Sequence, residues 1–554
     1  MRQLSVLDKG FLAAESREIP MHVGGVNLYT LPDGADEGEF LHSLADNLRD
    51  AEQFLPPFGD RLKTGRLGIA GPVHWEPDPA LDLDYHIRHS ALPTPGRYRE
   101  LFTLVSRLHT TLLDRGRPLW EMHLIEGLQN RQFATYTKAH HAGVDGARSI
   151  HISRSMLSTD PDWRLQESPL SINTWNAYRE QLKKGRTPQP SDDQLRNVLD
   201  ALKQTFDSGA NIYGAARRIT RAWTGKDDLL LPFLKVPTSS INTSISGARR
   251  CVAQSWPFAR IRAVGKAYDA TFNDTVLAMC GGALRKYLMN HAELPTESLK
   301  AMVPMNVRAE GDLDSSNAVA SINADLGTNI ADPAQRLTAI QASTAAGKSL
   351  FMDMSSEEAQ LLTLLLTTPG MLLMPLGLIS RMPPFNTVIS NVPGIRETSY
   401  WNGARMDGSY PVSIVMDGVA MNITLVSYGK NVDFGIIACR RSMPQVQRVI
   451  DYMEDALAEL EEAAGISWTD TAEKPRPKTK TKTKARVKRK TTAKASTQPK
   501  TKSRAKAKPK AAPKAKRKAT AKSKVTAKPK AKPKTRAKTK AKTKARPKAR
   551  PKRR

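Results

Sequence analysis

Hydrophobic and polar positions in the first third of the chain follow two periods, that of strands and that of helices. The run His22–Tyr29 alternates every second residue, as a half-buried strand does. Leucines at helical spacing lie between Arg99 and Leu113 and predict a helix. A short β-prone run, Gln132–Lys138, leads directly into His140. We therefore expect the N-terminal part to mix strands and helices.

The last part of the chain repeats this mixture. Apolar runs at 420–428 and 432–439 flank Gly429–Asn431, which predicts a β-hairpin. One helix is expected to begin at a cap formed by Asn273, and a final helix to cover Pro444–Glu462. Two α+β halves with a site between them are the expected architecture.

A polar stretch at 160–225 separates the two halves and is rich in Gln, Lys, Arg and Asp. We expect it to begin as an exposed connection and to continue as a helix over Asp193–Ile219. The predicted division is an N-terminal half at 1–185, a helical connection at 186–235, a C-terminal half at 236–466 and a tail at 467–554.

The segment Ala359–Ser380 carries no charged residue and is long enough to span a bilayer. Pro369, Gly370 and Pro375 interrupt it, so a broken pair of helices in the core or on an apolar surface is the favoured interpretation. An interfacial role against a lipid surface is left open.

The position of the net charge along the chain is more informative than its total. The 554 residues carry a formal charge of +31, yet 38 of the 85 Lys and Arg lie after Asp470, against one acid, Glu473. The remaining chain has more acids than bases. The tail is a Lys/Ala/Pro/Thr repeat with almost no large apolar residue, so we expect disorder. Its composition resembles linker-histone tails and predicts salt-dependent binding to DNA or anionic lipid, unless it only confers solubility.

Cysteine usage and the N-terminus bear on the compartment. The three cysteines, Cys251, Cys280 and Cys439, have no metal-site spacing and are expected to be buried free thiols. No signal-peptide core follows Met1. We therefore expect a cytoplasmic protein.

The sharpest chemical feature is His140-His141-Ala-Gly-Val-Asp145-Gly146, on an expected strand-to-helix loop. A histidine can accept the proton of an alcohol as the oxygen attacks a thioester carbonyl. The chain has no Gly-x-Ser-x-Gly nucleophile elbow, so direct transfer is the simpler mechanism. Metal ligation and ordinary burial of the histidines are the alternatives.

This motif matches His-His-x-x-x-Asp-Gly of the bacterial wax ester synthase/diacylglycerol acyltransferase family. The resemblance covers roughly residues 4–465 and stops at the tail. Further blocks agree in order: Leu4–Leu12, Pro20–Gly25, Asp82–His89, Leu113–Glu121 with Pro118-Leu119-Trp120, Asn273-Asp274, Val303–Arg308, Asn386–Gly394 and Met421–Tyr428.

The resemblance implies two halves of the chloramphenicol-acetyltransferase type, α/β two-layer sandwiches that face each other across a tunnel. It implies acyl-CoA as donor, diacylglycerol or a long-chain alcohol as acceptor, and neither a cofactor nor a metal. The base falls on His141, His140 supports it, and Asp145 holds the loop through a salt bridge. Peripheral association with the inner membrane or lipid droplets is expected, with nucleoid association through the tail.

Other positions have two interpretations each. Asn273 could donate to the developing oxyanion or only cap a helix. Ser390 and Asn391 could line the tunnel or only end a strand, and Gly146 permits close approach of a substrate. Arg308 could contact CoA phosphates, whereas Pro118-Leu119-Trp120 favours packing.

Two rival functions accompany the acyltransferase interpretation. One is a non-catalytic protein on an acyltransferase fold that tethers lipid droplets to the nucleoid. The other is an acyltransferase of the same fold that acts on a different hydrophobic alcohol. The intact motif argues against the non-catalytic protein. The apolar runs Leu361–Leu366 and Met371–Ile379 favour a hydrophobic acceptor.

Overall fold

The computed structural model describes residues 2–144, 146–184, 210–306, 319–351, 354, 356–373 and 377–468. The chain divides into two compact units, Met1–Ala472 and Glu473–Arg554, and every described residue belongs to the first. The basic tail lies outside the described residues, as does most of the helix predicted over Asp193–Ile219. The disorder of the tail and the predicted domain boundaries stay predictions.

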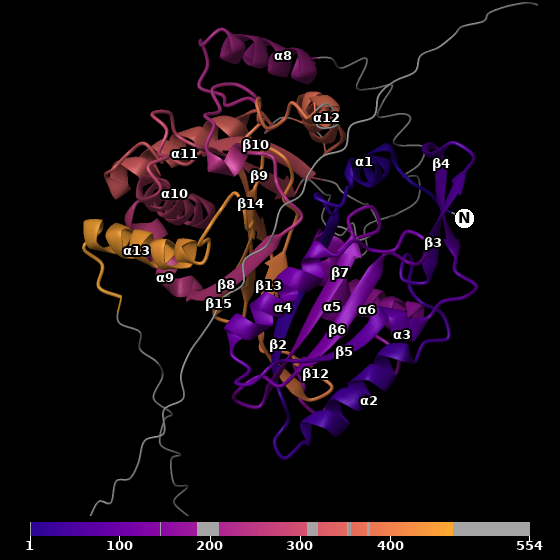
Figure 1. The fold of residues 1–554 in the computed structure, drawn as a ribbon. Helices are drawn as coiled ribbons and strands as arrows, with labels where there is room; N and C mark the ends of the chain where they lie inside the picture. The colour runs from indigo at the N-terminus through magenta and orange to yellow at the C-terminus, as the bar shows by residue number, and fades with distance from the viewer. Residues whose placement is uncertain are drawn as a thin grey trace, which may run out of the picture. The chain divides into compact units, whose positions relative to one another are not determined.

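One six-stranded sheet carries the double-histidine motif at the end of an inner strand (Figure 1). The strand predicted from His22 is confirmed, and it pairs in antiparallel register with the strand that ends at His140. Only one neighbouring pair, β5 and β6, is parallel. In spatial order the strands are β12 (Tyr400–Trp401), β13 (Ala404–Val412), β2 (His22–Thr30), β7 (Gln132–His140), β6 (Trp120–Glu126) and β5 (Ile87–Ala91).

A second six-stranded sheet forms the C-terminal half (Figure 1). Its core is built around one long helix whose buried residues run from Asp274 to Leu288. In spatial order the strands are β10 (Val319–Asp325), β9 (Lys300–Asn306), β11 (Thr387–Val392), β14 (Met421–Tyr428), β15 (Asn431–Cys439) and β8 (Arg249–Pro257).

Helices cover these sheets, and a small third sheet lies near the N-terminus. The third sheet has the order β1 (Arg2–Gln3), β4 (Gly68–Pro77), β3 (Asp60–Gly65). The helices are α1 (Val6–Ala14), α2 (Glu37–Arg49), α3 (Leu83–His86), α4 (Tyr98–Thr110), α5 (Gly146–Ser155), α6 (Ile172–Lys184), α8 (Ala210–Trp223), the 3-10 helix η1 (Ser240–Asn242), α9 (Phe258–Ala267), α10 (Phe272–Asn290), α11 (Pro333–Ser349), α12 (Ser356–Leu373) and α13 (Arg448–Ala463).

The expected hairpin near the C-terminus is confirmed as β14 and β15. Tyr428 and Asn431 form its last pair, so Gly429 and Lys430 make a two-residue turn. Gly429 has a φ of 53°, which is the left-handed conformation such a turn requires. The two fold halves of the α+β prediction are therefore present, each around its own sheet.

One connection crosses between the halves. Strands β12 and β13 follow β11 in the chain, yet they join the N-terminal sheet, where Tyr410 pairs with Val26. The two halves are thus locked together by main-chain hydrogen bonds, and not only by side-chain packing. No local pattern in the sequence marked this exchange.

The helix predicted between Arg99 and Leu113 is α4, and it ends earlier, at Thr110. The buried Lys138 gives the reason, because its Nζ donates to the carbonyls of Leu108 at 3.1 Å and Thr111 at 2.8 Å. These carbonyls accept hydrogen bonds from the Lys138 ammonium, where a longer helix would supply amide donors from its next turn. The predicted helical position of Leu112 is accordingly wrong, and that side chain is 36% exposed.

The cap predicted at Asn273 is also wrong. The N-cap of α10 is Thr271, whose hydroxyl accepts from the Asp274 amide at 3.2 Å while the Asp274 carboxylate accepts from the Thr271 amide at 3.1 Å. This reciprocal capping box satisfies the first amides of the helix. Asn273 therefore lies inside the first turn, and its side chain is not used as the cap.

The prediction of a broken helix pair in Ala359–Ser380 is wrong at Pro369. Helix α12 continues through Pro369 to Leu373. The carbonyl that the proline ring displaces belongs to Leu365, a residue that is 60% exposed, so this carbonyl can turn toward water. In the described part of the chain, no helix combines the length and apolarity needed to cross a membrane.

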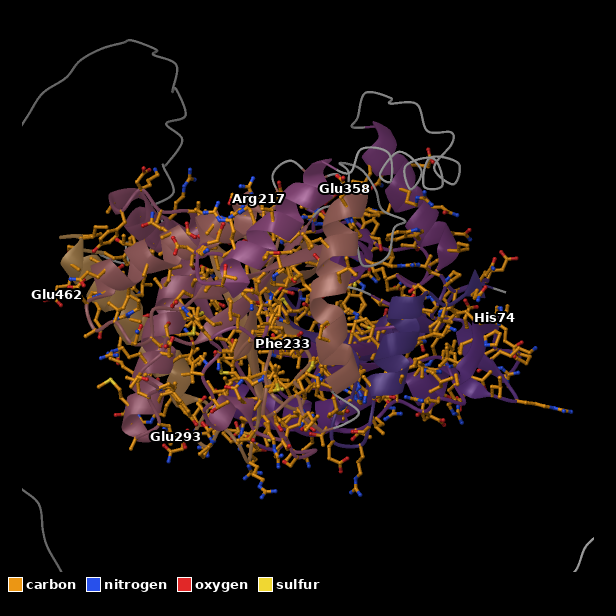
Figure 2. All side chains as sticks on the ribbon, turned by 90° about the horizontal axis from the view of Figure 1, so that it is seen from above. His74, Arg217, Phe233, Glu293, Glu358 and Glu462 are labelled. Carbon is orange, nitrogen blue, oxygen red and sulfur yellow. The ribbon has the colours of Figure 1, made fainter. Side chains whose placement is uncertain are left out.

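Figure 2 looks onto the face that carries α8 and α12, marked by Arg217 and Glu358. Phe233 is labelled in the same view, and a Cβ placed on Gly370 of α12 would come within 3.3 Å of its ring. Cys251, Cys280 and Cys439 are all free and buried, as the sequence predicted.

Candidate active site

The double-histidine loop begins where β7 ends. The amides of Gly143 and Val144 both donate to the carbonyl of His140, at 2.9 and 3.3 Å, and this closes a tight turn. Gly143 is required here because a Cβ would come within 2.9 Å of the Pro57 ring. Helix α5 then starts at Gly146. The expected strand-to-helix position of the motif is therefore confirmed.

The two histidines have different surroundings. His140 is buried, with 1% of its surface exposed, whereas His141 is partly exposed. The ring of His140 accepts the amide proton of Ala142 at Nδ1, at 3.1 Å, and so its Nε2 is the protonated nitrogen. His141 is held through its main chain, since its amide donates to the carbonyl of Met21 at 2.9 Å.

A carboxylate that the sequence did not single out lies beside His140. Glu15 places Oε1 at 3.4 Å from Nε2 of His140, and its Oε2 accepts two hydrogen bonds from Arg115, at 3.1 and 2.9 Å. Burial alone would raise the pKa of Glu15, but His140 and Arg115 outweigh burial and hold it at about 2. Glu15 is therefore an anion under all ordinary conditions.

Glu15→Gln is expected to weaken the fold in a pH-dependent manner. The folded-state pKa of Glu15 lies below its usual 4.5, so its stabilisation is complete above about pH 4.5 and is lost as pH falls toward 2. This pKa difference corresponds to about 3 kcal/mol at neutral pH as an upper limit. Urea unfolding between pH 7 and pH 3 should show the gap between wild type and variant closing as pH falls.

The control for this prediction is Glu76→Gln. Glu76 also has a lowered pKa, from a hydrogen bond to Lys63, but this pair lies at the surface. Solvent screening should leave that variant near wild type at every pH. A Glu15→Gln gap that stays constant from pH 7 to pH 3 would contradict the assignment of the charge to Glu15.

A buried polar network underlies the motif strand. Lys138 lies on the same face of β7 as His140, and its Nζ is 3.2 Å from the Glu121 carboxylate. Burial, followed by the charge of Lys138, lowers the pKa of His109 to about 3, and burial likewise lowers the pKa of His22. These two histidines are therefore neutral and contribute hydrogen bonds, such as the 2.8 Å contact from His22 Nε2 to the His109 carbonyl.

An aromatic side chain covers the accessible histidine. The ring of Phe11, on α1, stacks on the His141 imidazole with centroids 4.3 Å apart and planes 19° apart. The block Leu4–Leu12 quoted for the family resemblance therefore reaches the motif in space. Periodicity could not reveal this contact, because it joins residues 130 positions apart.

The structure brings two other predicted site residues together. Nδ2 of Asn391, on β11, donates to Oδ1 of Asn273, on α10, at 2.7 Å. Both side chains are partly exposed. Since the Asn273 oxygen is engaged as an acceptor, the group that Asn273 offers to a ligand is its amide N–H. The neighbouring Ser390 lies on the same strand and pairs with Thr424 of β14.

The ends of these elements meet across the two halves. Arg154, on the helix that follows the double-histidine loop, donates to the carbonyl of Gly394 at 2.7 Å. Gly394 lies two residues after the end of β11, and a Cβ there would come within 1.9 Å of the Ser427 carbonyl, so only glycine fits. Helix α5 of the first half is therefore tied to the strand end of the second half that carries Asn391.

Of the remaining predicted residues, some pack in the core and others lie outside the residues that the structure describes. Leu119 and Trp120 are buried, and the Trp120 indole donates to the Phe58 carbonyl at 2.8 Å, as expected for packing. Asp145 and Arg308 are outside the described residues, so their predicted roles stay predictions. Within the described ranges, His, Cys, Asp and Glu form no cluster that could hold a metal ion.

Fold and motif together define the class of this protein, which is that of the acyltransferases built from two such halves. Its fold is similar to the first condensation domain of the calcium-dependent antibiotic synthetase, with a TM-score of 0.51, coverage of 84% of this chain and 96% of that one, and only 14% identity. At that identity the likeness concerns the fold alone.

Closer comparisons give the family. The wax ester synthase/diacylglycerol acyltransferase catalytic domain matches residues 4–276, and the C-terminal domain of the same family matches 315–461. The chain therefore belongs to the wax ester synthase/diacylglycerol acyltransferase family.

Two relatives illustrate the degree of similarity. A probable diacylglycerol O-acyltransferase from Mycobacterium tuberculosis is 43% identical over 468 residues, which cover 83% of this chain and 98% of the relative. The solved wax ester synthase/diacylglycerol acyltransferase from Marinobacter aquaeolei VT8 is 40% identical, with a TM-score of 0.66. The match covers 84% of this chain and 100% of the Marinobacter chain. The prediction of an acyltransferase is confirmed, and the non-catalytic alternative gains no support.

Proposed function

We propose that this chain transfers a fatty acyl group from acyl-CoA to the hydroxyl of a diacylglycerol or a long-chain alcohol, with His141 as general base. The observation that carries this proposal is the division between the two histidines. His140 is buried and bonded on its strand, whereas His141 stands partly exposed on the turn. Only the second can meet a substrate.

In the proposed reaction the acceptor oxygen attacks the thioester carbonyl while His141 takes the hydroxyl proton. The C–O bond forms and the carbonyl oxygen becomes an oxyanion. The intermediate then collapses, the C–S bond breaks, and the imidazolium returns its proton to the CoA sulfur. Base catalysis of this kind typically supplies about 10²–10⁴-fold. No acyl-enzyme is needed.

Asn273 is the proposed oxyanion donor. Its oxygen accepts from Asn391, which leaves the amide N–H as the group offered to the substrate. A single donor of this type typically contributes about 10²–10³-fold. Ser390 and Gly146 are proposed to line the substrate path, and Asp145 to hold the loop. These roles rest on the family motif and, for Ser390, on its place next to Asn391 on β11.

The test of the function is release of CoA from palmitoyl-CoA, measured without acceptor, with hexadecanol, and with a diacylglycerol. Acceptor-dependent release, with the ester recovered as product, is expected. The ratio of the two rates ranks wax ester against triacylglycerol synthesis. Folded protein that releases no CoA with either acceptor would move the assignment to another hydrophobic alcohol, which an alcohol panel would then identify.

We further propose peripheral attachment to the inner membrane or to lipid droplets through the face of α8 and α12. Trp223, Leu365 and Met382 are 59, 60 and 57% exposed on these helices and the loop after α12. The exposed cations Arg217, which Figure 2 labels, and Arg221 belong to the same helix as Trp223, α8. Exposed apolar side chains with arginine on the same helix suit an anionic lipid surface.

Vesicle flotation tests this attachment. With vesicles of phosphatidylcholine and phosphatidylglycerol in high salt, which screens the tail, Trp223→Ala combined with Leu365→Ala is expected to weaken binding about tenfold or more. Leu67→Ala is the matched control, since Leu67 is 74% exposed but lies between β3 and β4. Equal losses in both variants would argue against this face.

The tail is proposed as a separate binding element for polyanions. Its 38 basic residues and single acid support contact with DNA or anionic lipid, and hence association with the nucleoid. It takes no part in the proposed chemistry, which lies within the first compact unit.

A further inference from the structure

We propose that helix α1 and its C-cap residue Glu15 form the positioning element of the double-histidine motif, with Phe11 acting on His141 and Glu15 acting on His140. This inference rests on the proposed role of His141 as the base. Neither Phe11 nor Glu15 belongs to the motif, and neither is placed in contact with substrate. Their proposed task is to fix the direction of the His141 imidazole, Phe11 by stacking on it and Glu15 through His140 and the neighbouring main chain.

Phe11 controls the plane of the His141 ring. With planes 19° apart and centroids at 4.3 Å, the phenyl ring stacks against one face of the imidazole. Rotation of the imidazole about its Cβ bond would push it into this ring. A general base must present its nitrogen within about 2.6–3.2 Å of the hydroxyl, so a fixed plane matters more than additional contact.

Glu15 controls the main chain on both sides of the motif. Its Oε1 accepts the amide of Met21 at 3.2 Å and faces Nε2 of His140 at 3.4 Å. Met21 in turn accepts the His141 amide, and His140 accepts the Ala142 amide through Nδ1. A carboxylate facing Nε2 selects the tautomer that leaves Nδ1 free to accept. One carboxylate therefore secures the backbone before and after His141.

Arg115 and the packing of α1 hold this element in place. The Arg115 guanidinium donates two hydrogen bonds to the Glu15 carboxylate and one to the carbonyl of Leu12, at 2.7 Å. Leu12 is buried in a cluster that also contains Leu119 and Ala142. In Figure 1, α1 lies at the end of β7 from which the loop emerges. The helix is thus packed against the loop that it positions.

The decisive experiment compares Phe11→Leu, Phe11→Tyr and Leu12→Val in the acceptor-dependent assay. Phe11→Leu keeps an apolar side chain but removes the stacked plane, so kcat should fall roughly 10- to 100-fold while KM for palmitoyl-CoA stays within about twofold. Phe11→Tyr keeps the plane and should retain a kcat close to wild type. Leu12→Val loosens the packing of the same helix against Ala142 but keeps both the stacked ring of Phe11 and the Glu15 carboxylate, so its kcat should fall by less than about threefold even if its Tm falls.

Two results would overturn the inference. One is a kcat for Phe11→Leu within about twofold of wild type, and the other is an equal loss in all three variants, which would mean that α1 is only structural. If Phe11→Leu does not fold, the kcat of Glu15→Gln is compared with that of Leu12→Val, and the same two outcomes overturn the inference. Assaying His141→Ala in parallel separates the two claims, because an active His141→Ala refutes the base itself, whereas an inactive one beside an unimpaired Phe11→Leu refutes only the role of α1.

Discussion

Replacing His141 with alanine is expected to reduce acceptor-dependent CoA release from palmitoyl-CoA by roughly 10²–10⁴-fold. The imidazole is the partly exposed ring of the motif pair, and His140 cannot replace it as the base because His140 is buried and bonded. Binding of acyl-CoA should persist, because the proposed contact forms only as the proton moves. Initial rates with hexadecanol and with a diacylglycerol, together with the Kd for palmitoyl-CoA, give the measurement.

His291→Ala is the matched control for this prediction. His291 is also partly exposed and also stacks on an aromatic ring, that of Tyr287, with centroids 4.3 Å apart. It lies at the end of α10, away from the motif loop. Its variant should keep wild-type rates. A His141→Ala enzyme that matches it would refute general base catalysis by His141, whichever acceptor is used.

Removing the tail is expected to abolish tight DNA binding while leaving catalysis intact. A chain that ends at Asp470 loses 38 basic residues and keeps the whole compact unit apart from two residues. A protein that makes 6–10 phosphate contacts loses about 10³–10⁵ in affinity between 50 and 200 mM salt, so the full-length chain should show such a slope. The shortened chain, whose remaining charge is slightly negative, should bind at least about 10²-fold more weakly in low salt.

The measurement is fluorescence anisotropy with a duplex of arbitrary sequence, repeated across salt for both chains, with CoA release as the control for folding. Little dependence on base sequence is expected, because the removed segment 471–554 has no aromatic residue for stacking. Comparable DNA affinity in the two chains would place the contact in the folded unit and contradict the proposal for the tail. Vesicles of anionic lipid in the same titration rank lipid against DNA as the preferred polyanion.

Local patterns were reliable where neighbouring residues decide the outcome. The hairpin of β14 and β15 follows from a two-residue turn between apolar runs, and β2 follows from its alternation. The same patterns were wrong where a distant residue or the solvent intervened. Lys138 ends α4 early, exposure lets α12 pass through Pro369, and Thr271 takes the cap predicted for Asn273.

The sequence by itself determined the class of protein, the motif that carries the chemistry and the histidine proposed as base, because a loop of seven residues and several ordered blocks are local features. Only the tertiary structure decided what surrounds that histidine. Phe11 and Glu15 reach the motif from α1, Asn391 reaches Asn273 from another strand, and β13 joins the sheet of the opposite half. Each of these contacts joins residues more than a hundred positions apart, and hydrophobic periodicity carries information only about neighbours along the chain.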